Sequence, residues 1–422
     1  MRKKEAGYYF ERIYRVLFYA LSISIVLWDK AVPTILVLLM ANWIAEANFR
    51  QKYQNVRNRF PFTSVFILLY LLYIAGLAYT SNFSYGLTDV LLKLPLFMFP
   101  VIVSSFPKST FNNHTIYTTP VIFTMAVFVA MLLCFINAGF NYQATGAVRQ
   151  LYYSNLAWFH HPSYLAMYSV FAISVILHRL TGSYSRKSIF YQSFLILSGM
   201  SLFVFIIMLS SRAGILALML TLIITGVFIL TEQKKTVKGI VFITAFIALF
   251  YTCYRNFPVA FGRLEHTGDV LAAPRLDVDT EDGTAQRILI WEASIDIIKD
   301  NLLLGVGTGD VKDELIRAYK LKGMTTTANG NKNAHNQYIQ TFVAIGLIGF
   351  VMLMLGLLIP GLYAIRQHNL LYFLFLTIIG LNLLFESMLE RQAGVMFYAF
   401  FNIVLFVLHL QSAVYSKSVE TS

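Results

Sequence analysis

Charged residues are scarce in this sequence, and their scarcity rules out an ordinary soluble domain. Asp, Glu, Lys and Arg together make up 13% of the 422 residues, whereas hydrophobic residues make up 57%. A soluble domain of average composition carries roughly twice that share of charged residues. The composition is instead typical of a protein that lies mostly within a lipid bilayer.

Cysteine is nearly absent as well. The two cysteines, Cys134 and Cys253, both fall inside apolar runs, which argues against a disulfide framework and against a metal site built on thiolates. The first apolar run is not followed by the small residues that mark a signal-peptide cleavage site. We therefore expect this run to be a retained membrane span rather than a removed signal peptide.

Cations outnumber anions without pointing to a nucleic-acid partner. The formal net charge is +12, but the excess Lys and Arg lie in short loops between apolar runs. The 36 Phe and 25 Tyr residues are abundant, as expected where aromatic rings line the two membrane interfaces. The partner that this composition predicts is membrane lipid.

About twelve apolar runs are long enough to cross a bilayer, which predicts an all-α integral membrane protein. The first two runs form a hairpin that turns at Asp29-Lys30. The predicted organisation is a membrane domain over residues 1–255, a helical external segment over 256–335, and a second membrane part over 336–422. The predicted spans cover residues 16–28, 32–44, 64–79, 87–104, 116–138, 164–177, 189–209, 215–230, 240–254, 338–358, 370–385 and 395–408.

The positive-inside rule gives the predicted orientation. Alternate loops carry the cations, and the opposite loops, such as residues 80–86, are nearly free of them. The cation-rich side is predicted to be the cytoplasm and to hold both termini, so that the segment 256–335 faces the periplasm. The cations in question are Arg2, Lys3, Lys4, Arg12, Arg15, Arg50, Lys52, Arg57, Arg59, Lys108, Arg179, Arg186, Lys187, Lys234, Lys235, Lys238 and Arg366.

The external segment contains a predicted amphipathic helix. Thr284 is placed to cap a helix that runs to about Asp300. Apolar residues recur along it at spacings of three and four, which puts them on one helical face. This face is predicted to lie on the membrane or on the spans, and it consists of Ile288, Trp291, Ile295 and Ile298.

A glycine-rich stretch and a second helix follow. Residues 305–309 (Gly-Val-Gly-Thr-Gly) are predicted to form a flexible turn, and Asp310 is placed to cap a helix over residues 311–322. Asn333 is the predicted cap of the tenth span, which would put His335 in the first turn of that helix. No strand precedes the glycines, so they are not a dinucleotide-binding fingerprint.

Three residues at the predicted external boundary are candidates for chemistry. Arg212 stands between two apolar runs, where burying a charge is costly. Arg287 opens the amphipathic helix, where a cation opposes the helix dipole. His335 begins a span, and the helix N-terminus and nearby arginines are expected to keep its ring neutral. The alternatives are a snorkelling arginine, a surface arginine and an interfacial histidine.

Weaker signals lie elsewhere in the chain. Asp277-Val278-Asp279 resembles a metal-binding pair of sugar transferases, but a solvated acidic loop is the favoured interpretation. His160 and His161 are adjacent and so do not share a helix face. Lys93 lies within the fourth run one turn from Asp89, and it either pairs with that residue or lines a polar cavity.

Taken together, four patches of the sequence resemble the O-antigen ligase and polymerase superfamily of polytopic glycosyltransferases. The resemblance extends from about His161 to Phe350, and the last two spans also fit, including Glu386-Ser387-Met388. The four patches are His161-Pro162-Ser163-Tyr164-Leu165-Ala166; Ser210-Ser211-Arg212-Ala213-Gly214; Arg287 and Trp291 with Gly305-Val306-Gly307-Thr308-Gly309; and Ala334-His335-Asn336-Gln337-Tyr338 with Gly346-Leu347-Ile348-Gly349.

The resemblance implies transfer of a glycan from undecaprenyl diphosphate to a sugar hydroxyl, as in a ligase that acts on the lipid A core oligosaccharide. Arg212 and Arg287 would grip the diphosphate and stabilise the leaving group, and His335 would act as general base. The implied reaction inverts the anomeric centre and needs neither metal nor cofactor. The candidate substrate-binding residues are Arg212, Arg287, Lys93, His161, Trp291 and Asn336.

Other functions remain open at this point. A polymerase or a protein O-oligosaccharyltransferase of the same superfamily would share the donor and differ in the acceptor. A lipid-linked oligosaccharide flippase would also have about twelve spans, but it would be expected to show internal repeats, and the sequence has none that we detect. The expected location in each case is the bacterial inner membrane, with the site facing the periplasm.

Overall fold

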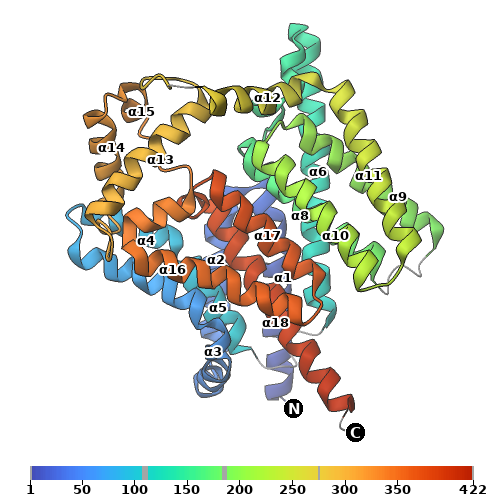
Figure 1. The fold of residues 1–422 in the computed structure, drawn as a ribbon. Helices are drawn as coiled ribbons and strands as arrows, with labels where there is room; N and C mark the ends of the chain where they lie inside the picture. Colours follow the sequence, from blue (N-terminus) through green and yellow to red (C-terminus); the bar gives the residue numbers. More distant parts are fainter. Residues whose placement is uncertain (1, 107–112, 183–187, 274–275, 421–422) are drawn as a thin grey trace.

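The computed structural model describes residues 2–106, 113–182, 188–273 and 276–420, and every regular element within them is a helix (Figure 1). In chain order these elements are α1 (Arg2–Leu27), η1 (Asp29–Ala31), α2 (Val32–Ala45), α3 (Phe49–Ala75), η2 (Gly76–Tyr79), α4 (Phe83–Lys93), α5 (Pro95–Ser105), α6 (Asn113–Thr145), η3 (Val148–Leu151), α7 (Tyr153–Leu156), α8 (Pro162–Thr181), α9 (Ile189–Met208), α10 (Arg212–Thr231), α11 (Thr236–Asn256), α12 (Pro258–Ala272), α13 (Gly283–Asp300), α14 (Val311–Leu321), α15 (Thr325–Asn329), α16 (Gln337–Arg366), α17 (Leu370–Phe385), η5 (Met388–Glu390) and α18 (Gln392–Glu420). The predicted all-α class is confirmed.

The predicted number of spans is not confirmed. Within the described residues, 7 helices are long and apolar enough to cross a membrane, or up to 8 if one bent pair counts as a span. That bent pair joins Asp29–Ala45 to Phe49–Phe60 at an angle of 114°. The second predicted run falls in α2, whose 14 residues reach only about 21 Å, less than the hydrocarbon thickness.

Three further predicted spans are shorter apolar helices in the structure. They are Thr63–Tyr79, Leu370–Phe385 and Gln392–Phe406. Lys108, Arg186 and Lys187, three of the cations behind the predicted orientation, lie outside the described residues. The side of the membrane on which each loop lies stays a prediction.

Aromatic rings from four helices form the centre of the helical bundle. Phe123 of α6 lies 4.8 Å from Phe401 of α18, measured between ring centroids, and Phe171 of α8 lies 5.0 Å from Phe401. Phe375 of α17 packs 5.6 Å from Phe397 of α18. Ring pairs at these distances add to the stability gained from burial. They fix α8, α17 and α18 relative to one another, and the ends of these helices carry part of the site described below.

The segment between α11 and α16 contains more helix than the sequence predicted. In Figure 1, α12, α13, α14 and α15 lie at the end of the molecule away from the two termini, and α12 was not predicted. Asp282, not Thr284, caps α13 by accepting hydrogen bonds from the backbone N–H groups of Thr284 and Ala285. An aspartate at this position also complements the helix dipole.

The buried face of α13 also differs from the prediction. Ile290, Ala293, Ser294 and Ile297 are buried, whereas Ile295 is exposed. The predicted stripe counted only large apolar residues. The helix in fact packs through a face that includes small ones.

The stretch of residues 305–309 is tightly packed, so the predicted flexible turn is wrong. It fits against a break in α16, where Ile345 and Gly346 leave helical geometry. The backbone N–H groups of Val306 and Gly307 donate to the carbonyls of Val343 and Ala344, at 2.9 and 3.0 Å. These bonds satisfy carbonyls that the break in the helix leaves free.

Replacing Gly346 with alanine is expected to destabilise the protein by about 2 kcal/mol or more. Gly346 has φ +65°, and an added Cβ would lie 2.2 Å from the Leu303 carbonyl oxygen. The melting temperature of detergent-purified protein measures the effect. The matched control is Gly361→Ala on the same helix, because a Cβ there meets nothing within 4 Å. Equal melting temperatures for the two variants would contradict the close packing of the chain against the break in α16.

Candidate functional site

A cavity of 1080 Å³ lies where segments far apart in the sequence meet. It is lined by the starts of several helices, by the loop after α17 and by residues of α12. Three of the lining residues, Arg212, Arg287 and His335, are the ones that the sequence singled out for chemistry. His161 lines it too. Residues separated by more than 170 positions are thus brought into one site.

Four long helices begin at this cavity. Arg212, Gly283 and Gln392, the first residues of α10, α13 and α18, line it, as do His161 and Ser163 at the start of α8. The N-terminus of a helix carries roughly half a unit of positive charge and free N–H donors. The convergence of four such ends favours an anionic ligand.

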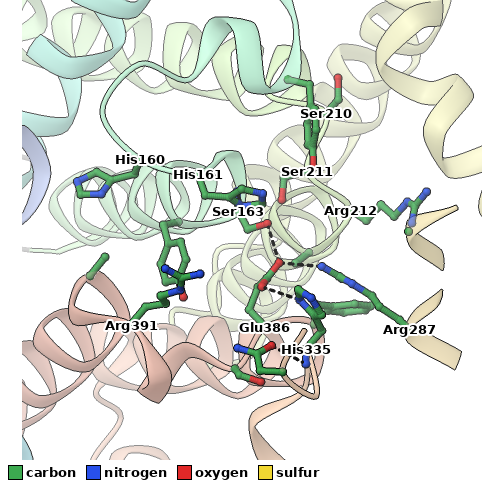
Figure 2. A pocket seen from close by; sticks show the side chains of 18 of the residues that line it. His160, His161, Ser163, Ser210, Ser211, Arg212, Arg287, His335, Glu386 and Arg391 are labelled. Atoms are coloured by element: carbon green, nitrogen blue, oxygen red, sulfur yellow. Dashed lines mark hydrogen bonds and ion pairs between the residues drawn. The ribbon is translucent and has the colours of Figure 1, made fainter. Parts of the chain in front are cut away.

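Glu386 connects the candidate residues to one another (Figure 2). Its Oε1 accepts a hydrogen bond from Arg287 Nη2 at 2.8 Å and a longer one from Ser163 Oγ at 3.3 Å. Its Oε2 lies 3.5 Å from His335 Nδ1. From the sequence, Glu386 was recognised only as part of a motif, because the residues that it contacts are 51 or more positions away in the chain. The periodicity of the sequence carries no signal for such contacts.

The pKa of Glu386 is lowered from 4.5 to about 2. Burial by itself would raise the pKa, but the contact with His335 and the charges of Arg287, His335 and His161 outweigh it. The carboxylate is therefore ionised throughout the physiological range. It neutralises part of the positive charge around it.

This lowered pKa makes stability depend on acid pH. Because the folded-state pKa lies below the ordinary value, the stabilisation is complete above pH 4.5 and is lost as the pH falls to about 2. A difference of this size corresponds to about 3 kcal/mol. The melting temperature of the wild type should therefore fall more steeply over this range than that of Glu386→Gln. Parallel curves for the two proteins would contradict the assignment.

His335 precedes α16 instead of lying in its first turn, so that prediction is wrong. The side chain of Asn336 caps α16 by accepting from the Ile339 N–H, and Asn333 accepts from the N–H of His335 itself. His335 has φ +46°, a left-handed conformation that non-glycine residues seldom adopt. Its Nδ1 is buried and lies 3.5 Å from Glu386 Oε2, but the direction of this contact is not that of a hydrogen bond.

Arg212 is bound to the first turn of α13. Its Nη1 donates to Thr284 Oγ1. Arg287 follows Thr284 by three residues and therefore lies on the same face of α13, one turn further along. Arg212 therefore contacts α13 one turn before the residue that carries the second guanidinium, which itself reaches Glu386. Figure 2 shows the two arginines on the same side of Glu386.

Three predicted substrate contacts lie outside the cavity lining. Lys93 is fully buried, where it binds the carboxylates of Asp89 and Glu390. Trp291 Nε1 donates to the Ala334 carbonyl at 3.0 Å, and Asn336 is the cap of α16. These side chains make structural contacts, and their assignment to the substrate stays a prediction.

The cavity also contains residues that the sequence analysis did not select. Arg391 and Lys332 add two cations to its lining. His266 of α12 pairs with Asp282 at 2.9 Å, which ties α12 to the start of α13. The contact between α12 and the start of α13 could not be predicted from the sequence, because α12 itself was not predicted.

Metal ligation has no obvious place in the described part of the chain. No group of three or more His, Cys, Asp or Glu side chains in those residues is placed to hold a metal ion. Asp279, from the candidate acidic pair, accepts hydrogen bonds from Thr325 Oγ1 and the Thr326 N–H. The carboxylate thus supports the start of α15. The chemical capacity of the cavity is binding of an anion by arginines and transfer of a proton by a histidine beside a carboxylate.

Comparison with known proteins finds one family over this part of the chain. A family described as O-antigen ligase matches residues 193–354, a range that contains Arg212, Arg287 and His335. An uncharacterized protein of Haemophilus influenzae is 32% identical over 83 residues, which is 20% of this chain and 21% of that protein. The chain therefore aligns with about a fifth of that relative's length.

Proposed function

We propose that this chain is a ligase-type glycosyltransferase of the O-antigen ligase and polymerase superfamily, a proposal supported by the match of residues 193–354 to the O-antigen ligase family. It moves a glycan from undecaprenyl diphosphate to a sugar hydroxyl of the lipid A core oligosaccharide. The reaction takes place at the periplasmic face of the bacterial inner membrane. The observation that carries the proposal is the meeting of Arg212, Arg287 and His335 in one cavity at which helix N-termini converge.

The two arginines hold the diphosphate of the donor. Arg212 at the start of α10 contacts Thr284 of α13, one turn before Arg287, and each guanidinium can form two parallel hydrogen bonds to phosphate oxygens. Negative charge grows on the diphosphate as the bond to the sugar breaks. Cations and helix dipoles already in place stabilise that charge without reorganising.

His335 takes the proton of the acceptor hydroxyl. With Nδ1 beside the Glu386 carboxylate, Nε2 is the ring nitrogen left to accept a proton. The acceptor oxygen forms a bond to the anomeric carbon. The bond from that carbon to the diphosphate oxygen breaks, and its electron pair leaves with the diphosphate. Attack from the side opposite the leaving group inverts the anomeric centre.

Glu386 acts through His335 and Arg287. A carboxylate 3.5 Å from Nδ1 stabilises the imidazolium that forms when the ring takes a proton, and it orients the ring once that charge is present. The same carboxylate holds Arg287 in the cavity at 2.8 Å. This dual contact couples the residue that binds the leaving group to the residue that activates the acceptor.

The glycan profile of a gene deletion distinguishes ligase from polymerase. A ligase deletion leaves long glycan on undecaprenyl diphosphate and a bare lipid A core. A polymerase deletion leaves single repeat units on the core. That result would overturn the ligase proposal and identify the protein as a polymerase. Transfer by the purified protein alone separates both enzymes from a flippase, which moves lipid but makes no glycosidic bond.

A further inference from the structure

Arg391 is a cation of the cavity that the proposed reaction does not use. It lies between η5 and α18, its side chain is exposed, and it lines the cavity. Among the residues that the structure describes, Arg391 forms no ion pair with a carboxylate, whereas Arg287 in the same cavity is paired with Glu386. In Figure 2, Arg391 and Arg287 lie on opposite sides of Glu386.

The backbone that carries Arg391 is held in place. Its N–H donates to the Met388 carbonyl at 3.3 Å, and its own carbonyl accepts from the N–H groups of Gly394 and Val395 at 3.0 Å. Glu390, the preceding residue, forms a buried ion pair with Lys93 at 2.9 Å. A fixed backbone means that only the side chain of Arg391, and not the main chain around it, has to be ordered when a ligand binds.

The surroundings of Arg391 favour an anion. Gln392 and Ala393, the first residues of α18, line the cavity next to it, so that the positive end of this helix dipole adds to its charge. His161 also lines the cavity. Asp29 is a carboxylate that also lines the cavity and acts against an anion, and Gln392 donates to its backbone carbonyl at 3.0 Å.

We propose that Arg391 binds an anionic group, a phosphate or a carboxylate, on the acceptor glycan. The inference rests on the proposed function, in which the acceptor attacks from the side opposite the diphosphate. With the donor diphosphate at Arg212 and Arg287, Arg391 lies across Glu386 from Arg287 (Figure 2), and we assign the acceptor to this side. An arginine binds a phosphate or a carboxylate through two parallel hydrogen bonds, and so it orients the acceptor as well as attracting it.

Steady-state kinetics of the purified full-length protein in detergent test this subsite. The donor is a glycan on undecaprenyl diphosphate. The acceptors are phosphorylated lipid A core oligosaccharide, the same material after enzymatic dephosphorylation, and the same material after chemical reduction of its carboxylates. Arg391→Ala should raise the acceptor KM about 10-fold to 100-fold, the range for a lost charge-assisted hydrogen bond, and change the donor KM less than about twofold.

Comparison of the acceptors identifies the anion. Removing the group that Arg391 binds should raise the wild-type acceptor KM as much as Arg391→Ala does, and Arg391→Ala should show no further rise with that acceptor. Arg391→Lys keeps the charge but loses the two parallel donors of the guanidinium, so its acceptor KM should lie between those of the wild type and Arg391→Ala. The wild-type acceptor KM values can be compared among the three acceptors without any variant, so the test would remain even if Arg391→Ala failed to fold.

Each failure has a distinct result. If Arg391→Ala transfers glycan with an unchanged acceptor KM, the acceptor subsite is overturned while the proposed function stands. The same holds if the donor KM rises instead of the acceptor KM. Wild-type transfer that is indifferent to both modified acceptors overturns it as well. Absence of any transfer by the wild type overturns the proposed function, and the subsite with it.

Discussion

Replacing Arg287 with alanine is expected to reduce glycan transfer by at least about 10³-fold while leaving the amount of membrane-inserted protein unchanged. The loss follows from removing a preorganised cation from the position where charge develops on the leaving group. The measurement is transfer from undecaprenyl-diphosphate glycan by purified protein, normalised to protein that passes through gel filtration as a single species. Normal transfer by this variant would remove Arg287 from the mechanism.

The matched control for this variant is Arg317→Ala on α14. Arg317 is 71% exposed and, within the described part of the chain, is ion-paired with Glu314 on its own helix, so the substitution has the same chemistry away from the cavity. Exposed pairs of this kind contribute little to stability. Arg317→Ala should therefore transfer glycan at the wild-type rate.

A double variant separates catalysis from charge balance. Arg287 also neutralises Glu386, and removing one partner of a partly buried ion pair leaves the other uncompensated. If charge balance were the only role of Arg287, adding Glu386→Gln to Arg287→Ala would restore activity to the level of Glu386→Gln alone. Because we assign Arg287 to the diphosphate, we expect stability to recover and transfer to stay low. Recovery of both would reduce Arg287 to a structural partner.

Much of this site could be predicted from the sequence because membranes restrict where charge is placed. An arginine between two apolar runs, such as Arg212, and a histidine at the edge of a span are unusual enough to be noticed one at a time. That these residues meet in a cavity came from the structure. Apolar periodicity reports which face of a helix is buried and says nothing about which helix ends converge.

The errors in the prediction have local physical causes. The glycines of residues 305–309 read as a flexible turn because glycine lowers local order in isolation, but here glycine is needed for close backbone contact with the break at Gly346. Lys93 was predicted either to pair with Asp89 or to line a polar cavity, because a lysine inside a span is costly, and the pairing with Asp89 is confirmed. The structure meets that cost with two carboxylates, one of them Glu390, almost 300 positions away.

Replacing His335 with alanine is expected to reduce the rate of transfer by about 10²-fold to 10⁴-fold, the range for loss of a general base. Donor binding should be nearly unchanged, because the arginines that hold the diphosphate remain. The effect should therefore fall on kcat and leave the donor KM near the wild-type value. A variant whose KM rises while kcat is preserved would show that His335 binds substrate and does not move the proton.

Chemical rescue makes the assignment of His335 sharper. Imidazole in the buffer can occupy the space vacated in His335→Ala and accept the proton of the acceptor hydroxyl, so the rate should rise with its concentration. Arg287→Ala should not respond, because its defect lies at the leaving group. Glu386→Gln should not respond either, since its own histidine is still in place. Rescue of all three variants alike would point to a general effect of imidazole on the assay. Rescue of His335→Ala alone assigns the proton transfer to that ring, with Glu386 as the residue that positions it.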